Sequence, residues 1–212
     1  MRTKYQDYTV LIVAAGCSRR MKKFKPLLPL GEGCILQSTI ESFQRAGLKN
    51  IIVVVGYKRH EVIPLLKTLG VRYAINRDYD ETDMLESIRL GLKEVKAGTS
   101  GILFCPGDVP LILRETIKSV IEAYEKQEAK ILIRACCGRQ GHPPVFSPEV
   151  IGEILSYKGD EGLRGVIGEY EKRHEVSCLE VEDEEVLQDT DLPEDYERLL
   201  RAYEQRRKGE IL

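Results

Sequence analysis

A basic stretch near the start of the chain carries the first residue types that could do chemistry. An apolar run over residues 10–15 ends in Gly16, and a cationic loop follows it. The cations of this loop are Arg19, Arg20, Lys22, Lys23 and Lys25. Gly16 has no side chain, so a ligand can approach the main chain there. Exposed backbone N–H groups in such a turn form an anion-binding concavity, to which the cations add charge. The stretch is typical of a phosphate-binding loop at the end of a strand.

An aspartate after a later apolar run could complete such a site. Asp108 lies in the segment Gly107–Pro110, directly after the apolar residues 102–105. A carboxylate at that place can bind a Mg²⁺ ion that bridges the phosphates of a nucleotide. The alternative is that Asp108 only caps a turn or the next helix. Taken alone, the segment favours neither interpretation. The basic loop, predicted at the same edge of the fold, favours the metal.

A second acidic segment offers further metal ligands. Mg²⁺ usually takes one or two carboxylates in addition to phosphate oxygens and water. Asp189 and Asp191 stand just before the predicted C-terminal helix and are the candidates. The alternative is an acidic helix N-terminus that complements the helix dipole. Taken by itself, that alternative is the better interpretation.

The elements that must position these residues alternate along the chain. Buried strands are predicted over 10–15, 51–56, 71–75, 102–105 and 131–135, with a short strand over 144–146. Helices are predicted over 35–46, 60–69, 84–95 and 115–125. In the third helix, Met84 shares an apolar face with Ile88. This order predicts an α/β fold, with a mostly parallel sheet covered by helices on both faces. Ligands of such sheets bind at the carboxyl ends of the strands, where Gly16, Asn76 and Asp108 would lie together.

The last third of the chain is less regular. Helices are predicted over 148–155 and 161–170, a strand over 174–181 and a strongly charged, exposed helix over 193–206. There is no internal repeat, low-complexity tract or linker. We therefore expect a single domain over residues 1–212.

Composition excludes several classes of function. A net charge of −2 gives no overall attraction to nucleic acid. No apolar run approaches the ~20 residues of a membrane helix, and residues 1–9 lack a secretory apolar stretch, so we expect a cytoplasmic protein. The six cysteines lack disulfide-framework spacing. Without a C-x-x-C pair, and with only three histidines, a structural zinc site is not expected.

The motifs together resemble a known family. The run over residues 14–28 is followed in order by Asn76, the helix at 87–92 and Gly107–Pro110. The segments 141–143, 159–164 and 189–195 continue the series. The chain resembles the MobA-like branch of nucleotidyltransferases, and within it the molybdenum-cofactor cytidylyltransferases. That resemblance covers nearly the whole chain. It implies a three-layer α/β/α, Rossmann-like fold of the glycosyltransferase-A type, with a mostly parallel mixed sheet.

The resemblance also implies roles for individual residues. Ala14, Ala15 and Gly16 would contact the nucleotide through their backbone, and Ser18, Arg20 and Lys25 would contact or neutralise its triphosphate. Asn76 and Ser87 would line the base and ribose pocket. Asp108 and Asp191 would hold Mg²⁺, with Asp189 as the alternative second ligand. His142 would face the acceptor, and Arg20, Lys25 and Asp108 would form the catalytic set.

By the same resemblance, the reaction joins a nucleotide to the phosphate of molybdopterin or its molybdenum-loaded form, and pyrophosphate leaves. Ala15 favours CTP as the donor, because guanylyl-transferring relatives usually have a second glycine there. A molybdenum hydroxylase or its chaperone is the implied protein partner. One alternative keeps the nucleotide site but uses a sugar phosphate or another small phosphorylated metabolite as acceptor. The other alternative is a nucleotide-binding or cofactor-binding chaperone without catalysis, which the atypical segment 83–86 motivates.

Overall fold

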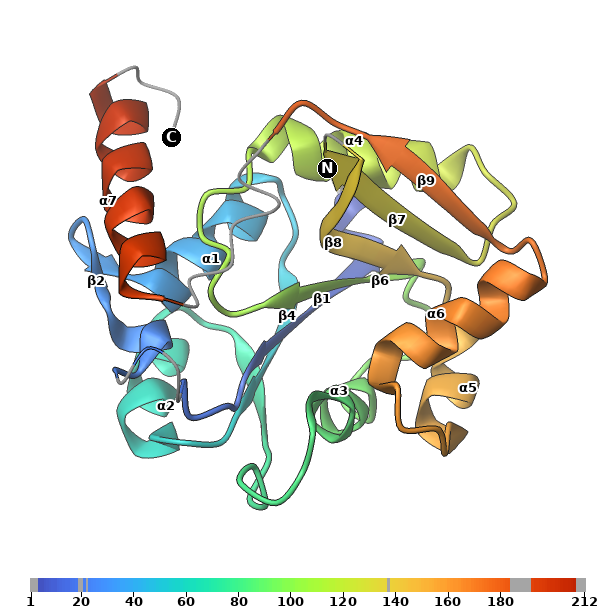
Figure 1. Ribbon diagram of the computed structural model, residues 1–212, viewed down its shortest axis with the longest axis horizontal. Coiled ribbons are helices and arrows are strands. Elements are labelled where there is room, and N and C mark those ends of the chain that lie inside the picture. Colours follow the sequence, from blue (N-terminus) through green and yellow to red (C-terminus); the bar gives the residue numbers. More distant parts are fainter. Residues whose placement is uncertain (1–3, 19–20, 22, 137, 184–191, 209–212) are drawn as a thin grey trace.

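A seven-stranded mixed sheet forms the centre of the protein (Figure 1). The computed structural model describes residues 4–18, 21, 23–136, 138–183 and 192–208. In spatial order the strands are β5 (Arg72–Ile75), β4 (Asn50–Val55), β1 (Tyr8–Ala14), β6 (Gly101–Pro106), β8 (Arg139–Phe146), β7 (Ile131–Cys136) and β9 (Val176–Glu180). Only β8 runs antiparallel to its neighbours in this sheet, so six carboxyl ends share one edge.

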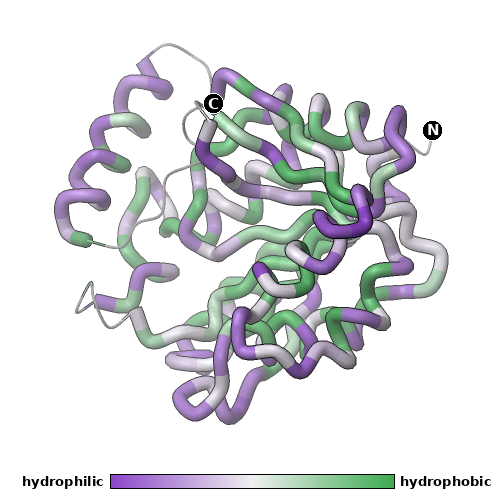
Figure 2. Tube along the Cα trace, turned by 45° about the vertical axis from the view of Figure 1, so that its right-hand side comes forward, coloured by the Kyte–Doolittle hydropathy of each residue, from purple (hydrophilic) through white to green (hydrophobic). Residues whose placement is uncertain are grey.

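Helices cover both faces of the sheet, as the alternation of elements predicts (Figure 1). One face packs against α1 (Ile35–Arg45), α2 (Arg59–Thr68) and α4 (Arg114–Glu125). The other packs against α3 (Met84–Leu92), α5 (Val150–Ser156) and α6 (Gly162–Lys172). Figure 2 shows the hydrophobic residues concentrated along the central strands. The three-layer α/β/α class is therefore confirmed.

A third, smaller core lies under the last helix, α7 (Pro193–Lys208). Leu199 is the buried residue of α7, and it packs in this core with Met21 and Leu30. Leu30 belongs to the hairpin of β2 (Pro29–Leu30) and β3 (Gly33–Cys34), and the Tyr196 hydroxyl donates to the Pro29 carbonyl at 2.6 Å. The sequence predicts an exposed helix here. Although most of α7 is hydrophilic (Figure 2), one side of it packs against the hairpin.

Two further differences from the sequence predictions concern the sheet edge. β8 begins at Arg139, earlier than expected, because residues 139–141 pair with the end of β7. Met84 is 57% exposed instead of sharing the buried face of its helix. It is the first residue of α3, after the N-cap Asp83, and the buried residues of the helix begin with Leu85. No helix among the described residues is long and apolar enough to cross a membrane.

The contact between α3 and the sheet yields a stability prediction. A Cβ placed on Gly91 would lie 2.8 Å from Val54 Cγ2 and would also meet the buried side chain of Leu11. We expect Gly91→Ala to destabilise the protein by roughly 1–3 kcal/mol, because overpacking outweighs the better helix propensity of alanine. Urea unfolding measures the change.

Gly168 in α6 is the matched control, because a Cβ there would meet no atom within 4 Å. Gly168→Ala should stabilise the protein by about 0.5–1 kcal/mol through helix propensity alone. A Gly91→Ala protein as stable as the Gly168→Ala protein would show that α3 does not pack closely on β1 and β4.

Candidate active site

An open cleft lies at the edge where β1 and β6 end. Its volume is about 640 Å³, within the range of small-molecule sites. Its walls are formed by Val13, Gly16, Cys17, Ser18, Lys25, Pro26, Tyr79, Asp80, Thr82, Met84, Pro106, Gly107, Asp108 and His142. The structure thus brings together five of the predicted site residues, namely Gly16, Ser18, Lys25, Asp108 and His142.

The loop after β1 presents its backbone to this cleft. Gly16 is exposed, and a Cβ placed on it would meet no atom within 4 Å. Ser18 adopts a left-handed conformation with φ of 53°, which a non-glycine residue rarely does outside constrained, often functional, loops. Its Oγ accepts a hydrogen bond from the backbone N–H of Lys25 at 3.2 Å. This bond closes the loop and sets Lys25 at the start of a short 3-10 helix, Lys25–Leu27.

Ala14 and Ala15 have buried side chains, 5% and 2% exposed, in the two main cores. The Ala15 carbonyl accepts from the Tyr57 N–H at 2.9 Å. The side chain of Ala15 therefore packs inward. Any influence of this residue on base selection acts through the course of the backbone.

Lys25 and Asp108 form an ion pair across the cleft. Lys25 Nζ lies 2.8 Å from Asp108 Oδ2, and the two side chains are only 12% and 16% exposed. Residues far apart in the chain thus put a cation and a carboxylate side by side. Partial burial strengthens their interaction over that of a surface pair.

The loop that carries Asp108 is held from two sides. The Gly107 N–H donates to the Val13 carbonyl at 2.9 Å, and a Cβ on Gly107 would lie 2.9 Å from Ala14 Cβ. On the other side, α1 supplies two buried hydroxyls. Thr39 Oγ1 donates to the Gly107 carbonyl at 3.3 Å and Ser42 Oγ to the Pro110 carbonyl at 2.8 Å.

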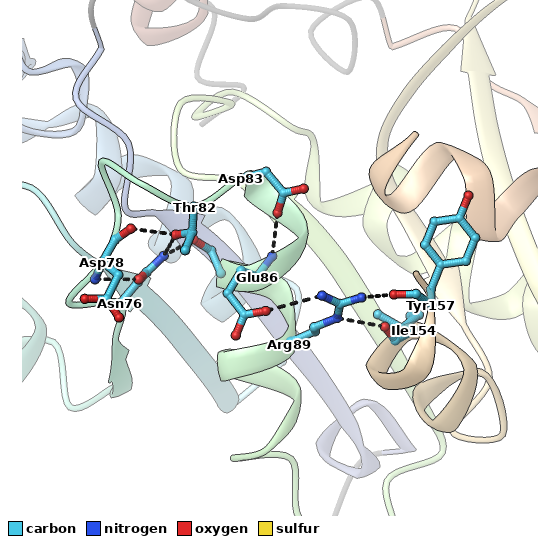
Figure 3. Close-up of polar contacts among 9 residues, drawn as sticks. Asn76, Asp78, Thr82, Asp83, Glu86, Arg89, Ile154 and Tyr157 are labelled. Atoms are coloured by element: carbon cyan, nitrogen blue, oxygen red, sulfur yellow. Dashed lines mark hydrogen bonds and ion pairs between the residues drawn. The ribbon is translucent and has the colours of Figure 1, made fainter. Parts of the chain in front are cut away.

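Asn76 and Ser87 are buried beside the cleft, and Figure 3 shows the contacts of Asn76 with Asp78 and Thr82. Asn76 Nδ2 donates to Ser87 Oγ and to Thr82 Oγ1, each at 3.0 Å, and Asn76 Oδ1 accepts from the Asp78 N–H at 3.0 Å. The network fixes the loop that carries Tyr79 and Thr82 into the cleft wall. Asn76 and Ser87 themselves are not among the described residues that line the cleft. Their contact with base and ribose stays a prediction.

The atypical segment 83–86 begins a well-anchored helix (Figure 3). Asp83 Oδ1 caps α3 by accepting the Glu86 N–H at 2.9 Å. Glu86 in turn pairs with Arg89 at 3.3 Å. The guanidinium of Arg89 also donates to the carbonyls of Ile154 and Tyr157, which ties α3 to α5. The segment therefore has a structural role in starting and orienting α3.

His142 reaches the cleft from β8. Its Nδ1 is buried and has no hydrogen-bond partner among the described residues. Burial first, and then the positive charge of Arg134, lower the pKa of His142 to about 4. The imidazole is therefore neutral at physiological pH.

Sequence reasoning missed several residues that shape the site. Tyr79 lines the cleft and stands at the end of an aromatic row, in which the Phe24 and Tyr57 ring centroids are 5.5 Å apart and those of Tyr57 and Tyr79 are 6.0 Å apart. Thr39 and Ser42 are polar residues on the buried face of α1. This pair of polar residues, three positions apart on an otherwise apolar helix face, was the sequence signal that could have indicated a buried polar contact there.

Arg20, Asp189 and Asp191 lie outside the described residues. Among the described residues there is no group of three or more His, Cys, Asp or Glu side chains that could hold a metal ion. A divalent cation still fits the chemistry at Asp108, because Mg²⁺ in nucleotide sites commonly takes one or two carboxylates and completes its shell with phosphate oxygens and water. The five described cysteines are free thiols.

The comparisons identify the class of protein. The model of the MobA-like NTP transferase domain family matches residues 10–176, and the chain belongs to this family. The bifunctional protein GlmU of Thermoanaerobacter pseudethanolicus is 27% identical over 180 residues, which are 83% of this chain and 36% of that protein. The chain thus spans about a third of the length of that curated relative.

Solved structures give the same fold. Rv0371c from Mycobacterium tuberculosis H37Rv superposes with a TM-score of 0.80 at 29% identity, covering 92% of this chain and 97% of the other. A second structure of Rv0371c, in complex with manganese, superposes with a TM-score of 0.73 at 26% identity over 92% and 98% of the two chains. A nucleotidyl transferase from Methanothermobacter reaches a TM-score of 0.81 at 21% identity, covering 93% and 98%.

The neutral state of the half-buried His142 yields a prediction on pH. The pKa of His142 is about 4 in the native protein, against ~6.5 in the unfolded chain. Between these values the unfolded chain binds a proton that the native state does not, so native stability falls as the pH drops through this window.

The free energy of unfolding decreases between pH 7 and pH 4, and we expect this decrease to be smaller by roughly 1–3 kcal/mol in the His142→Gln protein. Urea unfolding at the two pH values measures the difference. The exposed His60 is the control, and His60→Gln should retain the pH dependence of the unmodified protein. Equal pH dependence in the His142→Gln protein would contradict the assignment.

Proposed function

We propose that this protein is a divalent-metal-dependent nucleotidyltransferase. It moves CMP from CTP onto the phosphate of a molybdopterin-type acceptor. The observation that carries the proposal is the convergence of the Gly16–Ser18 loop, Lys25 and Asp108 on one cleft, with His142 in the same wall. Membership of the NTP transferase family supports the donor class.

The reaction is a displacement at the α-phosphorus of the donor. An oxygen of the acceptor phosphate forms a new bond to that phosphorus, the bond to the oxygen that bridges the α- and β-phosphates breaks, and pyrophosphate leaves with the electron pair. The nucleophile is already anionic, so a strong general base is not required. The protein has to align the two substrates and stabilise the charge that develops on the leaving group.

The described residues suit these tasks. The open backbone at Gly16 leaves room for the triphosphate, and the Lys25 ammonium supplies positive charge where the leaving group gathers negative charge. Asp108 would hold the metal ion, which supplies charge neutralisation and fixes the phosphates when bound. A manganese complex of the related Rv0371c supports a divalent cation in this family. Asp191 or Asp189 would provide the second carboxylate.

The acceptor and the base are the finer parts of the proposal. CTP and molybdopterin rest on the resemblance of the motifs, and Mg²⁺ is the proposed ion. A sugar phosphate or another phosphorylated metabolite is the alternative acceptor. We place the protein in the cytoplasm, with a molybdenum hydroxylase or its chaperone as the recipient of the product.

Pyrophosphate release tests the donor and the acceptor together. The purified protein is incubated with Mg²⁺, each of the four ribonucleoside triphosphates and a panel of acceptors that contains molybdopterin, its molybdenum-loaded form and several sugar phosphates. We expect release with CTP and a molybdopterin acceptor. Release only with a sugar phosphate would overturn the acceptor. Absence of release with every pair would overturn catalysis.

Asp108→Asn separates an enzyme from a binding protein. We expect turnover to fall at least about 100-fold, because the metal ligand is lost. CTP affinity, measured by calorimetry, should fall by less than about tenfold, because the backbone loop and Lys25 remain. Asp80→Asn is the control, since it removes a carboxylate from the rim of the same cleft, and it should keep most of the activity. Unchanged turnover in the Asp108→Asn protein would contradict the assigned role.

A further inference from the structure

Arg134 is a buried cation without a hydrogen-bond partner in the part of the chain that the structure describes. It lies in β7 and is 0% exposed. None of its three guanidinium nitrogens has a hydrogen-bond partner among the described residues. Asp183 is near enough to interact with its charge, but the Asp183 carboxylate accepts hydrogen bonds from the Leu113 N–H at 3.0 Å and from Arg206 at 3.4 Å.

Such a group does not stabilise the fold. Burial lowers the pKa of Arg134 to about 10, so the side chain remains a cation at physiological pH. A buried charge without hydrogen bonds opposes folding, and an apolar side chain of similar volume is often better tolerated. An unsatisfied buried polar group in a native protein needs an explanation, and a functional role that is kept at the expense of stability is one. The guanidinium fork suits planar or tetrahedral oxyanions, which accept two of its N–H groups at once.

The position of Arg134 connects it to the cleft. Arg134 pairs with Gly141 of β8, and the regular ladder resumes at the pair Leu132 and Val145. The residues between Gly141 and Val145 therefore form an irregular, bulged segment that includes His142. Bulges next to active sites often re-aim a side chain. Here the bulge carries His142 into the cleft wall, close enough to Arg134 to be affected by its charge.

Two buried polar groups thus lack hydrogen-bond partners among the described residues, the guanidinium of Arg134 and Nδ1 of His142, and the charge of Arg134 acts on the imidazole. We propose that they form an oxyanion subsite for the phosphomonoester group of the acceptor. This inference rests on the proposed function and specifies how the nucleophile is recognised. Arg134 is sealed from solvent, so the proposed subsite requires the bulged His142 segment to shift before a phosphate can reach the guanidinium. His142, at the cleft surface, contacts the phosphate first.

The subsite has the place that the reaction needs. His142 and Asp108 line one cleft, so a phosphate held at His142 lies within the same cavity as the donor triphosphate. Lys25 and the Gly16–Ser18 loop serve the donor, and Arg134 with His142 serves the acceptor. Separate cations for separate phosphates bring two anionic substrates together and reduce their mutual repulsion.

The test uses methyl phosphate as the probe and the imidazole NMR signals of the full chain as the readout. We expect saturable shifts of the His142 signals with methyl phosphate. Acetate, the carboxylate arm of the test, should bind at least ~10-fold more weakly, because it offers fewer oxygens and less charge. Arg134→Met should weaken methyl phosphate at least ~10-fold, and Arg134→Lys should retain part of the affinity. Tighter binding of acetate than of methyl phosphate would overturn the choice of ligand.

Thermal unfolding provides a second readout. Arg134→Met should raise the midpoint by about 2–8 °C in the absence of ligand, because it removes an unsatisfied buried charge. Methyl phosphate should raise the midpoint of the unmodified protein but not that of the variant. The control is Arg139→Met, which removes an exposed arginine from the same strand pair and should change neither result. An Arg134→Met protein that is less stable and binds methyl phosphate normally would show a purely structural arginine and overturn the subsite.

Calorimetry with CTP and Mg²⁺ on the same samples distinguishes the two proposals. Arg134→Met should leave CTP affinity within about twofold, whereas Lys25→Met should lower CTP affinity and spare methyl phosphate. Methyl phosphate bound through Arg134 in a protein that does not bind CTP would support the subsite and overturn the proposed function. Normal turnover of CTP, with an acceptor KM that Arg134→Met does not change, would support the proposed function and overturn the subsite.

Discussion

The ion pair between Lys25 and Asp108 is the interaction around which the candidate site is built. Each partner depends on a different part of the fold. Lys25 is placed by the loop that Ser18 closes, and Asp108 by a loop that β1 and two hydroxyls of α1 hold. The pair connects these two parts of the fold, with Lys25 Nζ 2.8 Å from Asp108 Oδ2. It also sets the electrostatic balance of the cleft, because each charge partly neutralises the other until phosphates or a metal compete for them.

Two buried polar side chains near the cleft, Asn76 and Arg134, differ in their hydrogen bonding. Asn76 has its side-chain oxygen and nitrogen bonded within the chain, so it gives rigidity to the loop at 76–83. Arg134 has no such bonds among the described residues, so it adds to the cost of folding. The same degree of burial therefore has opposite meanings in the two cases. The hydrogen bonds of Asn76 indicate a structural role, whereas Arg134 is the side chain that we propose to bind a ligand.

Much of the fold was predictable, because buried parallel strands are continuous apolar runs and their helices carry an apolar face at regular spacing. The edge of the sheet was predictable for the same reason, and it located Gly16 and Asp108 in one cleft. The direction of β8 and the bulge at His142 were not, since pairing between distant strands leaves no local pattern. Arg134 was also not apparent. The sequence around a single arginine in an apolar strand is the same whether the guanidinium binds another residue of the chain or a ligand.

The packing of α7 has a consequence for how the protein is made. The Tyr196 hydroxyl bonds the Pro29 carbonyl across 167 residues, and Leu199 shares a core with Met21 of the basic loop. Contacts of such sequence separation form late, and chains emerge from the ribosome with the N-terminus first. The strands that carry the cleft can pair while synthesis continues, but Met21 and Leu30 stay uncovered until α7 is made. A nascent chain should thus acquire its central sheet well before Met21 and the β2–β3 hairpin gain the cover of α7.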